Sequence, residues 1–173
     1  MILAVDPGLG GAMFFLDPQA ATGEAVDIPV HVLVRGGKQK REIDIAQLIG
    51  LLAQHQVEHA FVEQVGSMPG EGVSSTFAFG KAFGIILGVI AARSIPVTLV
   101  PPVRWKRVMG VTKSKDGCRA RASQLLPLAA YQWPLRKHDG RAEACLIALF
   151  GARQLQDPVA DIFVLNAIEP VVV

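Results

Sequence analysis

Two apolar runs in this chain each end on a carboxylate, and this pattern constrains the fold more than any other feature of the sequence. Residues 2–5 lead into Asp6, and residues 60–62 lead into Glu63. An ionised acid at the tip of a buried strand loses hydration energy unless a cation compensates for the loss. The repeated arrangement therefore predicts that these carboxylates meet at one edge of a sheet, around a divalent ion such as Mg²⁺.

A third acidic pair, Asp139 and Glu143, lies far downstream at the start of an apolar segment. Residues four apart project from the same face of a helix, and a helix N-terminus favours anions. We therefore expect both carboxylates to reach the same ion as Asp6 and Glu63. The alternatives are that Asp139 is only a helix N-cap, that Glu143 is an exposed helix acid, and that Asp6 caps the turn after its strand.

Basic residues gather in three segments, although the net charge of the chain is only +2. Residues 1–34 contain no Lys or Arg, whereas residues 35–41 are predicted to form a basic glycine-containing loop, and residues 104–121 hold seven basic residues against one Asp. The third group, Arg136, Lys137 and Arg141, flanks the downstream acids. Cations beside metal-binding acids suit a site that brings a phosphate backbone to the metal. For each segment taken alone, a solvated basic face is the alternative.

The size and cysteine content point to one domain in a reducing compartment. A chain of 173 residues, about half of them apolar, can bury one full core. Its two cysteines, Cys118 and Cys145, lack the spacing of a metal knuckle and are too few for a disulfide framework. No basic segment precedes an apolar stretch at the start, so we expect a cytoplasmic protein.

The hydrophobic periodicity predicts an α/β fold with one mixed sheet. The expected strands are residues 1–6, 11–16 and 25–33, forming an antiparallel meander, followed by 59–63 and 95–100. The expected helices are residues 43–52, 77–92, 114–126 and 140–154. The helix at 77–92 is apolar on nearly all sides, but it is too short for a bilayer span and carries Lys81, so we expect no membrane association.

Six short segments follow one another along the chain: LAVDPG at 3–8, VEQV at 62–65, FGKAFG at 79–84, PV at 96–97, RWKRVMG at 104–110, and the segment from His138-Asp139 to Ile147-Ala148. In their order and spacing these motifs resemble the RuvC family of Holliday junction resolvases, which have the RNase H-like fold. The resemblance is colinear over residues 1–154, which we take as the nuclease domain. The tail 155–173 has no assigned role and could add a strand at 162–165.

This resemblance implies a mixed five-stranded sheet with its first and fourth strands adjacent and helices on both faces. Asp6, Glu63, Asp139 and Glu143 would hold two Mg²⁺ or Mn²⁺ ions, which cut a phosphodiester of branched DNA. Lys106 and Lys115, with Lys113 as an alternative to the latter, fall where the family carries basic residues near the scissile phosphate. The apolar helix at 77–92 would join two copies in a homodimer that cuts a four-way junction symmetrically.

The expected DNA contacts come from the basic segments and from the loop after Glu63: they are Arg35, Lys38, Lys40, Arg41, Met68, Arg104, Lys106, Arg107, Lys113, Lys115 and Lys137.

Three departures from the family pattern resemble its divergent phage-type branch, so a bacterial or phage-encoded protein is expected. Position 143 is Glu where the family typically has Asp, and position 140 is Gly where the family often has a further acid. Met68 lies near the place of an aromatic residue that stacks on a junction base. Two alternatives stay open: a general branched-DNA, flap or RNA–DNA hybrid nuclease of the same fold, and a non-catalytic structure-specific DNA-binding protein.

Overall fold

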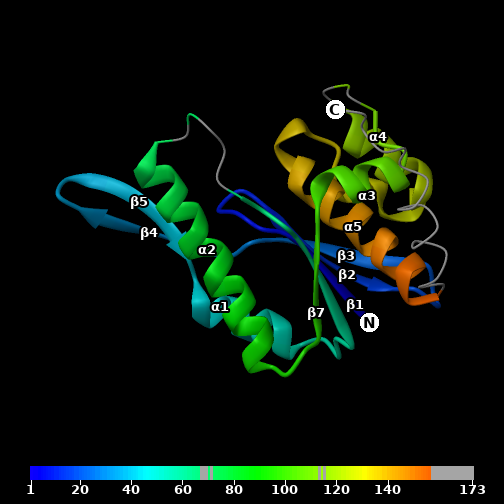
Figure 1. The fold of residues 1–173 in the computed structure, drawn as a ribbon, viewed down its shortest axis with the longest axis horizontal. Helices are drawn as coiled ribbons and strands as arrows, with labels where there is room; N and C mark the ends of the chain where they lie inside the picture. Colours follow the sequence, from blue (N-terminus) through cyan, green and yellow to red (C-terminus); the bar gives the residue numbers. More distant parts are fainter. Residues whose placement is uncertain (67–69, 71, 113, 115, 157–173) are drawn as a thin grey trace, which may run out of the picture.

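A five-stranded mixed sheet forms the centre of the structure, in the strand order β3-β2-β1-β6-β7 (Figure 1). This computed structural model describes residues 1–66, 70, 72–112, 114 and 116–156, and only the backbone of Arg35 and Lys38. The strands are β1 (Ile2–Asp6), β2 (Ala12–Asp17), β3 (Thr22–Asp27), β6 (His59–Glu63) and β7 (Val97–Val100). The first three are antiparallel, β6 runs parallel to β1, and β7 runs parallel to β6. The predicted mixed sheet, with its first and fourth strands adjacent, is confirmed.

Helices cover both faces of this sheet, as predicted (Figure 1). One face carries α3 (Pro102–Val108), α4 (Gly117–Leu125), α5 (Asp139–Gln156) and the short 3-10 helices η1 (Pro127–Gln132) and η2 (Arg136–His138). The other face carries α1 (Ile45–Ala53) and α2 (Val73–Ala92). Each face has its own apolar core, because side chains alternate along a strand: Ala4 belongs to the α5 side, whereas Leu3 and Val5 belong to the α2 side.

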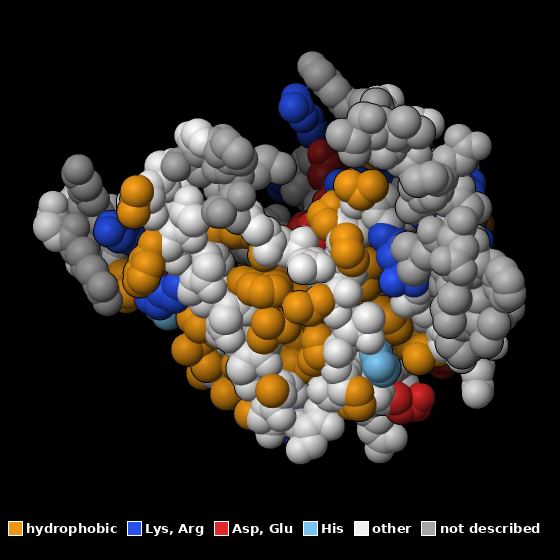
Figure 2. Space-filling model, viewed as in Figure 1, with side chains coloured by type: hydrophobic (Ala, Val, Ile, Leu, Met, Phe, Trp, Pro, Cys, Tyr) orange, Lys and Arg blue, Asp and Glu red, His pale blue; other side chains and the backbone are white. Residues whose placement is uncertain are grey.

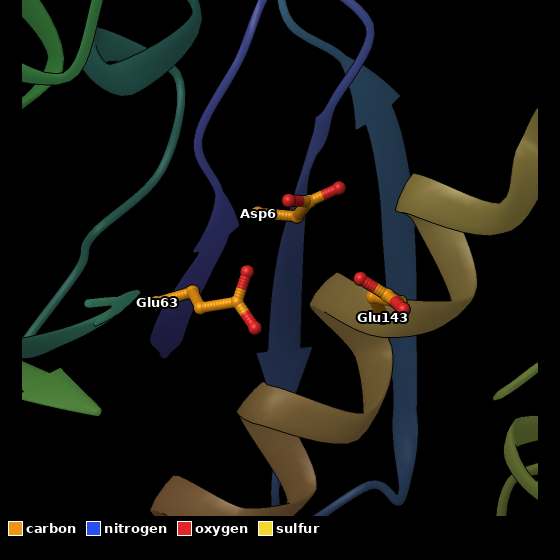
Figure 3. A group of neighbouring side chains, drawn as sticks. All are labelled: Asp6, Glu63 and Glu143. Atoms are coloured by element: carbon orange, nitrogen blue, oxygen red, sulfur yellow. The ribbon is translucent and has the colours of Figure 1, made fainter. Parts of the chain in front are cut away.

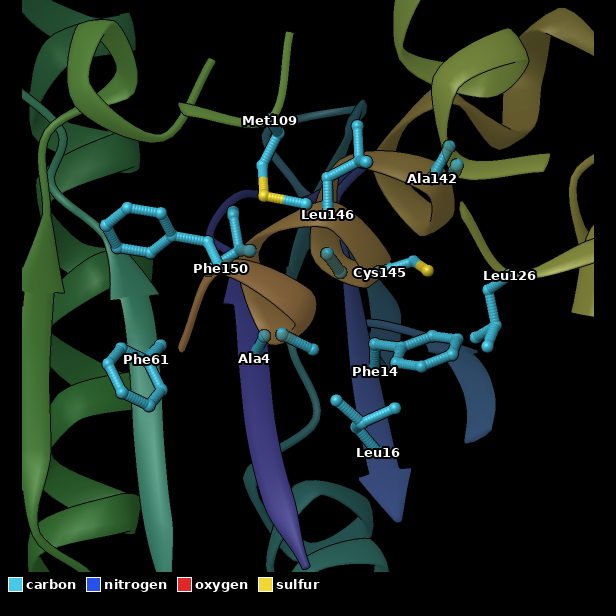
Figure 4. Close-up of a cluster of buried hydrophobic side chains, with 14 of the residues drawn as sticks. Ala4, Phe14, Leu16, Phe61, Met109, Leu126, Ala142, Cys145, Leu146 and Phe150 are labelled. Atoms are coloured by element: carbon cyan, nitrogen blue, oxygen red, sulfur yellow. The ribbon is translucent and has the colours of Figure 1, made fainter. Parts of the chain in front are cut away.

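The core on the α5 side is built from aromatic and aliphatic side chains of the sheet and of α5 (Figure 4). Phe14 and Phe61 project from strands toward Leu146 and Phe150 of α5, and all four are fully buried. Burial of each such side chain contributes about 1.5–3 kcal/mol to folding. This packing fixes α5 across β1 and β6, the two strands that end on acids.

The basic segment at residues 35–41 forms a β-hairpin, so its prediction as a loop is wrong. The hairpin consists of β4 (Val30–Arg35) and β5 (Lys38–Ile43), which pair with each other and not with the main sheet. Gly36 and Gly37 form its two-residue turn with φ angles of 58° and 72°, the left-handed conformation that a type I′ turn requires. The expected strand at 25–33 is likewise two strands, because β3 ends at Asp27 and β4 begins at Val30.

The helix α3 is not among the helices predicted from the sequence. Pro101 is the N-cap of α3 and Pro102 its first residue, where the missing N–H of proline costs nothing. The other predicted helices are present with shifted ends: 43–52 is Ile45–Ala53, 114–126 is Gly117–Leu125, and 140–154 is part of Asp139–Gln156.

The helix α2 begins at Val73, four residues earlier than predicted, and presents much of its apolar surface to solvent. Ala82, Ile86 and Ile90 are buried against the sheet, whereas Val73 and Phe77 are 87% and 74% exposed. By length and composition α2 could cross a membrane, a test that the core helices of folded domains also pass. Figure 2 shows a band of apolar side chains over this part of the molecule.

Some of the sequence predictions concern residues that the structure does not describe. Met68, Lys113 and Lys115 are among these, as is the strand-like run at 162–165. Of the predicted tail 155–173, the first two residues belong to the end of α5 and the rest lies outside the described residues.

The close packing of α5 on β6 gives a test of the fold. A Cβ atom at Gly151 would collide with the Phe61 ring, so Gly151→Ala should lower the free energy of unfolding by about 1–3 kcal/mol. The control is Gly50→Ala in α1, where a Cβ meets nothing within 4 Å and helix propensity should add up to about 1 kcal/mol. Urea denaturation of both variants checks the difference, and equal stabilities would contradict the packing described here.

Candidate metal centre

Three acids from three different elements converge at one end of the sheet (Figure 3). Asp6 ends β1, Glu63 ends β6, and Glu143 lies in the second turn of α5. One carboxylate oxygen from each lies within 4.8 Å of the other two. The three side chains point toward a common space between the strand ends and the helix, and we refer to them as the acidic trio.

Strand pairing and alternation explain why Asp6 and Glu63 meet. The parallel register places Val5 opposite Val62, so the next residue of each strand is one of the two acids. Val5 and Val62 belong to the core on the α2 side, and successive side chains of a strand point to opposite faces. Both carboxylates therefore face α5, which supplies Glu143.

Glycines allow the backbone to approach Asp6 closely. A Cβ atom at Gly140 would lie 2.8 Å from the Asp6 Oδ2 atom, and one at Gly11 would collide with the Asp6 carbonyl oxygen. Gly140 is three residues before Glu143, the position where the RuvC family often has an acid. In this chain the Asp6 carboxylate lies against Gly140, so a side chain at position 140 would require Asp6 or the Gly11 backbone to shift.

The environment of the trio disfavours negative charge in the absence of a cation. Burial and the nearby charges of Glu143 and Glu63 raise the pKa of Asp6 from 3.8 to about 7. Burial also raises the pKa of Glu63, against a hydrogen bond from Trp105 that lowers it. Glu63 is 8% exposed and is the one charged side chain among the buried residues of the described chain. A divalent cation with oxygen ligands would relieve this cost, so the donor set fits Mg²⁺ or Mn²⁺.

Side chains from α3 and α4 donate hydrogen bonds to the two glutamates of the trio. The Trp105 indole Nε1 donates to Glu63 Oε1 at 2.9 Å, and Lys106 Nζ donates to Glu143 Oε1 at 3.2 Å. The Cys118 thiol also donates to Glu143 Oε1, at 3.2 Å, and burial together with the Glu143 charge raises the pKa of Cys118 to about 12. Burial alone would lower the pKa of Lys106, but Glu143 and Glu63 outweigh it and the pKa is raised.

Asp139, the fourth predicted ligand, makes a different contact in the structure. Its Oδ1 atom accepts a hydrogen bond from Arg119 Nε at 2.6 Å, and Arg119 also pairs with Asp116. Asp139 and Glu143 nevertheless line the same open pocket. The role of Asp139 as a metal ligand stays a prediction.

The predicted DNA-binding cations lie in several places around the trio. Lys106 and Arg107 line the pocket that holds Glu143, and Figure 2 shows acidic side chains recessed in a hollow with basic ones beside it. Lys40 and Arg41 line a groove between the hairpin and α2, where Arg41 Nη2 donates to the Leu9 carbonyl oxygen at 2.6 Å.

Two predicted cations lie outside these two pockets. Arg104 lies over the Phe150 ring and lines a different pocket with His59 and Thr98. Lys137 is exposed on η2.

Sequence reasoning missed several residues around the trio. Trp105, Cys118 and Gly11 were not predicted as site residues, and Gly140 was noted only as a departure from the family pattern. Recognising Pro102 as a helix start would have placed Trp105 and Lys106 together on α3. For Cys118 no signal in the sequence indicates the contact with Glu143, which depends on how α4 packs against α5.

Known proteins resemble this chain in fold, but no sequence family matches it. No protein-family model and no curated protein matches the sequence. Among solved structures, it resembles RuvC from T. thermophilus in complex with a Holliday junction substrate, with a TM-score of 0.62 and 15% identity over 90% of this chain and 94% of that chain.

A second Thermus thermophilus RuvC structure has a TM-score of 0.55 and 18% identity, over 90% and 95% of the two chains. The chain therefore has the RuvC-like RNase H fold, as the motifs predicted. This fold and the acidic trio are consistent with a metal-dependent nuclease.

The raised pKa of Asp6 predicts a pH-dependent cost in the metal-free protein. Unfolded Asp6 ionises near 3.8 and folded Asp6 near 7, so ionisation opposes folding as the pH rises through this range. At pH 8 in EDTA, Asp6→Asn should raise the free energy of unfolding by about 1–3 kcal/mol, with a much smaller gain at pH 4.5. Urea denaturation at the two pH values measures both gains. Equal gains at pH 8 and pH 4.5 would show that Asp6 is not desolvated.

Proposed function

We propose that this protein is a metal-dependent endonuclease that cuts branched DNA, with the four-way junction as its substrate. The observation that carries the proposal is the acidic trio at the strand ends, with ligand oxygens within 4.8 Å of one another, in a RuvC-like fold. The similar RuvC structure is a complex with a Holliday junction, which supports the choice of substrate.

The trio would hold the metal, and Asp139 is the proposed fourth ligand. Bound Mg²⁺ or Mn²⁺, with two ions proposed per site, would polarise the phosphodiester and lower the pKa of a water molecule. Asp6, Glu63 and Glu143 are already gathered, whereas the Asp139 carboxylate would have to leave Arg119.

Lys106 is the proposed catalytic cation, and its position beside the trio supports this role. Its Nζ atom lies 3.2 Å from Glu143 Oε1 and lines the open pocket. From there an ammonium group can hold a phosphate oxygen while the acids hold the metal, and so neutralise charge that develops on the phosphoryl group. Lys115 and Lys113 are proposed for the same surface and lie outside the described residues.

The proposed DNA path runs from this pocket to the hairpin. Lys106 and Arg107 lie at one end of this path, and Lys40 and Arg41 lie at the other. Arg41 donates a hydrogen bond to Leu9, in the turn that follows Asp6. Basic residues on both sides of the trio suit a duplex arm that passes over the metal site. The other proposed contacts are Arg35, Lys38, Met68, Arg104 and Lys137.

The exposed face of α2 is the proposed homodimer interface. Gly80, Gly84 and Gly88 recur every four residues, are exposed, and leave open space where a Cβ would lie. Small residues at this spacing let two helices approach closely, and Phe77 adds exposed apolar area beside them. A two-fold dimer would place two acidic trios on one four-way junction.

Cleavage of defined substrates tests the proposal directly. The purified protein should place paired symmetric nicks in a synthetic four-way junction with Mg²⁺ or Mn²⁺, and Glu63→Gln should reduce the rate by at least about 10³-fold because it removes a metal ligand. A flap, a linear duplex and an RNA–DNA hybrid serve as controls. Cleavage of every branched substrate would favour a general nuclease, and tight junction binding without cleavage would favour a non-catalytic DNA-binding protein.

The hairpin contact with DNA is testable through salt dependence. If Lys40 binds a phosphate, Lys40→Gln should weaken junction binding uniformly and reduce the slope of log K against log[salt] by about one. Gln39→Ala, at the neighbouring uncharged position, is the matched control. Fluorescence anisotropy in Ca²⁺ across a salt series gives both slopes. An unchanged slope in Lys40→Gln would remove the hairpin from the DNA path.

A further inference from the structure

Trp105 makes a contact that the proposed chemistry does not yet use. Its side chain is fully buried in the core on the α5 side, yet its one polar atom, indole Nε1, faces the metal centre. It donates to Glu63 Oε1 at 2.9 Å. A hydrogen bond to an ionised carboxylate is roughly twice as strong as one between neutral groups. The contact therefore restricts the rotation of a side chain that must present its oxygens to a metal.

The start of α3 places Trp105 and Lys106 on the two glutamates of the trio. These consecutive residues project from α3 about 100° apart, so Trp105 contacts Glu63 while Lys106 contacts Glu143. The two are also in contact with each other, because Lys106 Nζ lies 4.9 Å from the centre of the Trp105 ring. One short helix thus contacts both glutamates of the trio.

Trp133, the other tryptophan of the chain, shows what a purely structural role looks like. It belongs to the same core, is 1% exposed, and donates its indole N–H to the Ser123 hydroxyl at 2.9 Å. The two tryptophans match in burial, in core and in the length of the hydrogen bond, and they differ in the acceptor. Only the Trp105 acceptor is a member of the trio.

We infer that Trp105 is a positioning residue for metal binding, which orients the Glu63 carboxylate so that its remaining lone pairs face Asp6 and Glu143. This inference rests on the proposed function, because it assigns a role at the same metal centre. Groups that hydrogen-bond to metal ligands typically contribute 10–100-fold to metal affinity. Lys106 then acts on Glu143 from the next position of the same helix.

Titration with Mn²⁺ alone tests the inference by calorimetry on the full chain. Trp105→Phe keeps most of the buried ring and removes the N–H donor, so it should weaken Mn²⁺ binding by about tenfold or more. Trp133→Phe loses an equivalent buried hydrogen bond and should bind Mn²⁺ within about twofold of the unmodified protein. Equal Mn²⁺ affinities of the two variants would overturn the inference.

A second measurement needs no variant of Trp105 and so stands even if Trp105→Phe fails to fold. With ¹⁵N-labelled tryptophan the protein has two indole N–H signals, which Trp133→Phe assigns. Saturable addition of Mg²⁺ should shift the Trp105 signal and leave the Trp133 signal in place. Mg²⁺ binding that moves neither signal would overturn the inference.

The two measurements separate this inference from the function on which it rests. Absence of saturable Mn²⁺ binding to the unmodified protein would overturn the proposed metal centre, and the positioning role with it. Binding to the unmodified protein that Trp105→Phe leaves intact would overturn the positioning role alone.

Discussion

Burial of three carboxylates close together, with the repulsion among them added to it, is the constraint on which the rest of this structure depends. β1 and β6 deliver Asp6 and Glu63 side by side, and α5 packs across both strands to bring Glu143 against them. Burial first, and the charges of the neighbouring acids second, raise the pKa of Asp6 and of Glu63. Such an arrangement persists because the core beneath it, including Phe61 and Phe150, outweighs the local electrostatic cost.

Two features adapt the RuvC-like fold to this particular set of acids. Gly140 leaves room for the Asp6 carboxylate at the position where the family often has a further acid, and Arg119 binds Asp139. Helix α3 supplies the two glutamates with one neutral donor, the Trp105 indole, and one cationic donor, the Lys106 ammonium group. The centre is therefore built from three gathered acids and their donors, with the fourth acid one helical turn away.

The sequence predicted the sheet and named all three acids of the trio, because those features follow from local rules. Alternation along strands and the pairing of parallel strands place Asp6 and Glu63 on one face. The helical i,i+4 rule put Asp139 on the same face as Glu143, but Gly140, three residues before Glu143, is the residue that meets Asp6. The Trp105 contact could not be predicted, since it joins residues 42 apart and depends on where α3 starts. The hairpin was missed although Gly36 and Gly37 are suited to its turn.

The central claim is that Asp6, Glu63 and Glu143 together bind a divalent cation. Anomalous diffraction from crystals grown with Mn²⁺ tests it most directly, because it locates the ion without reference to any activity. The account predicts an anomalous peak in contact with carboxylate oxygens of all three residues, about 2.0–2.4 Å from each. An anomalous peak elsewhere would contradict the claim. The absence of a peak at saturating Mn²⁺, with Lys106 still hydrogen-bonded to Glu143, would contradict it as well.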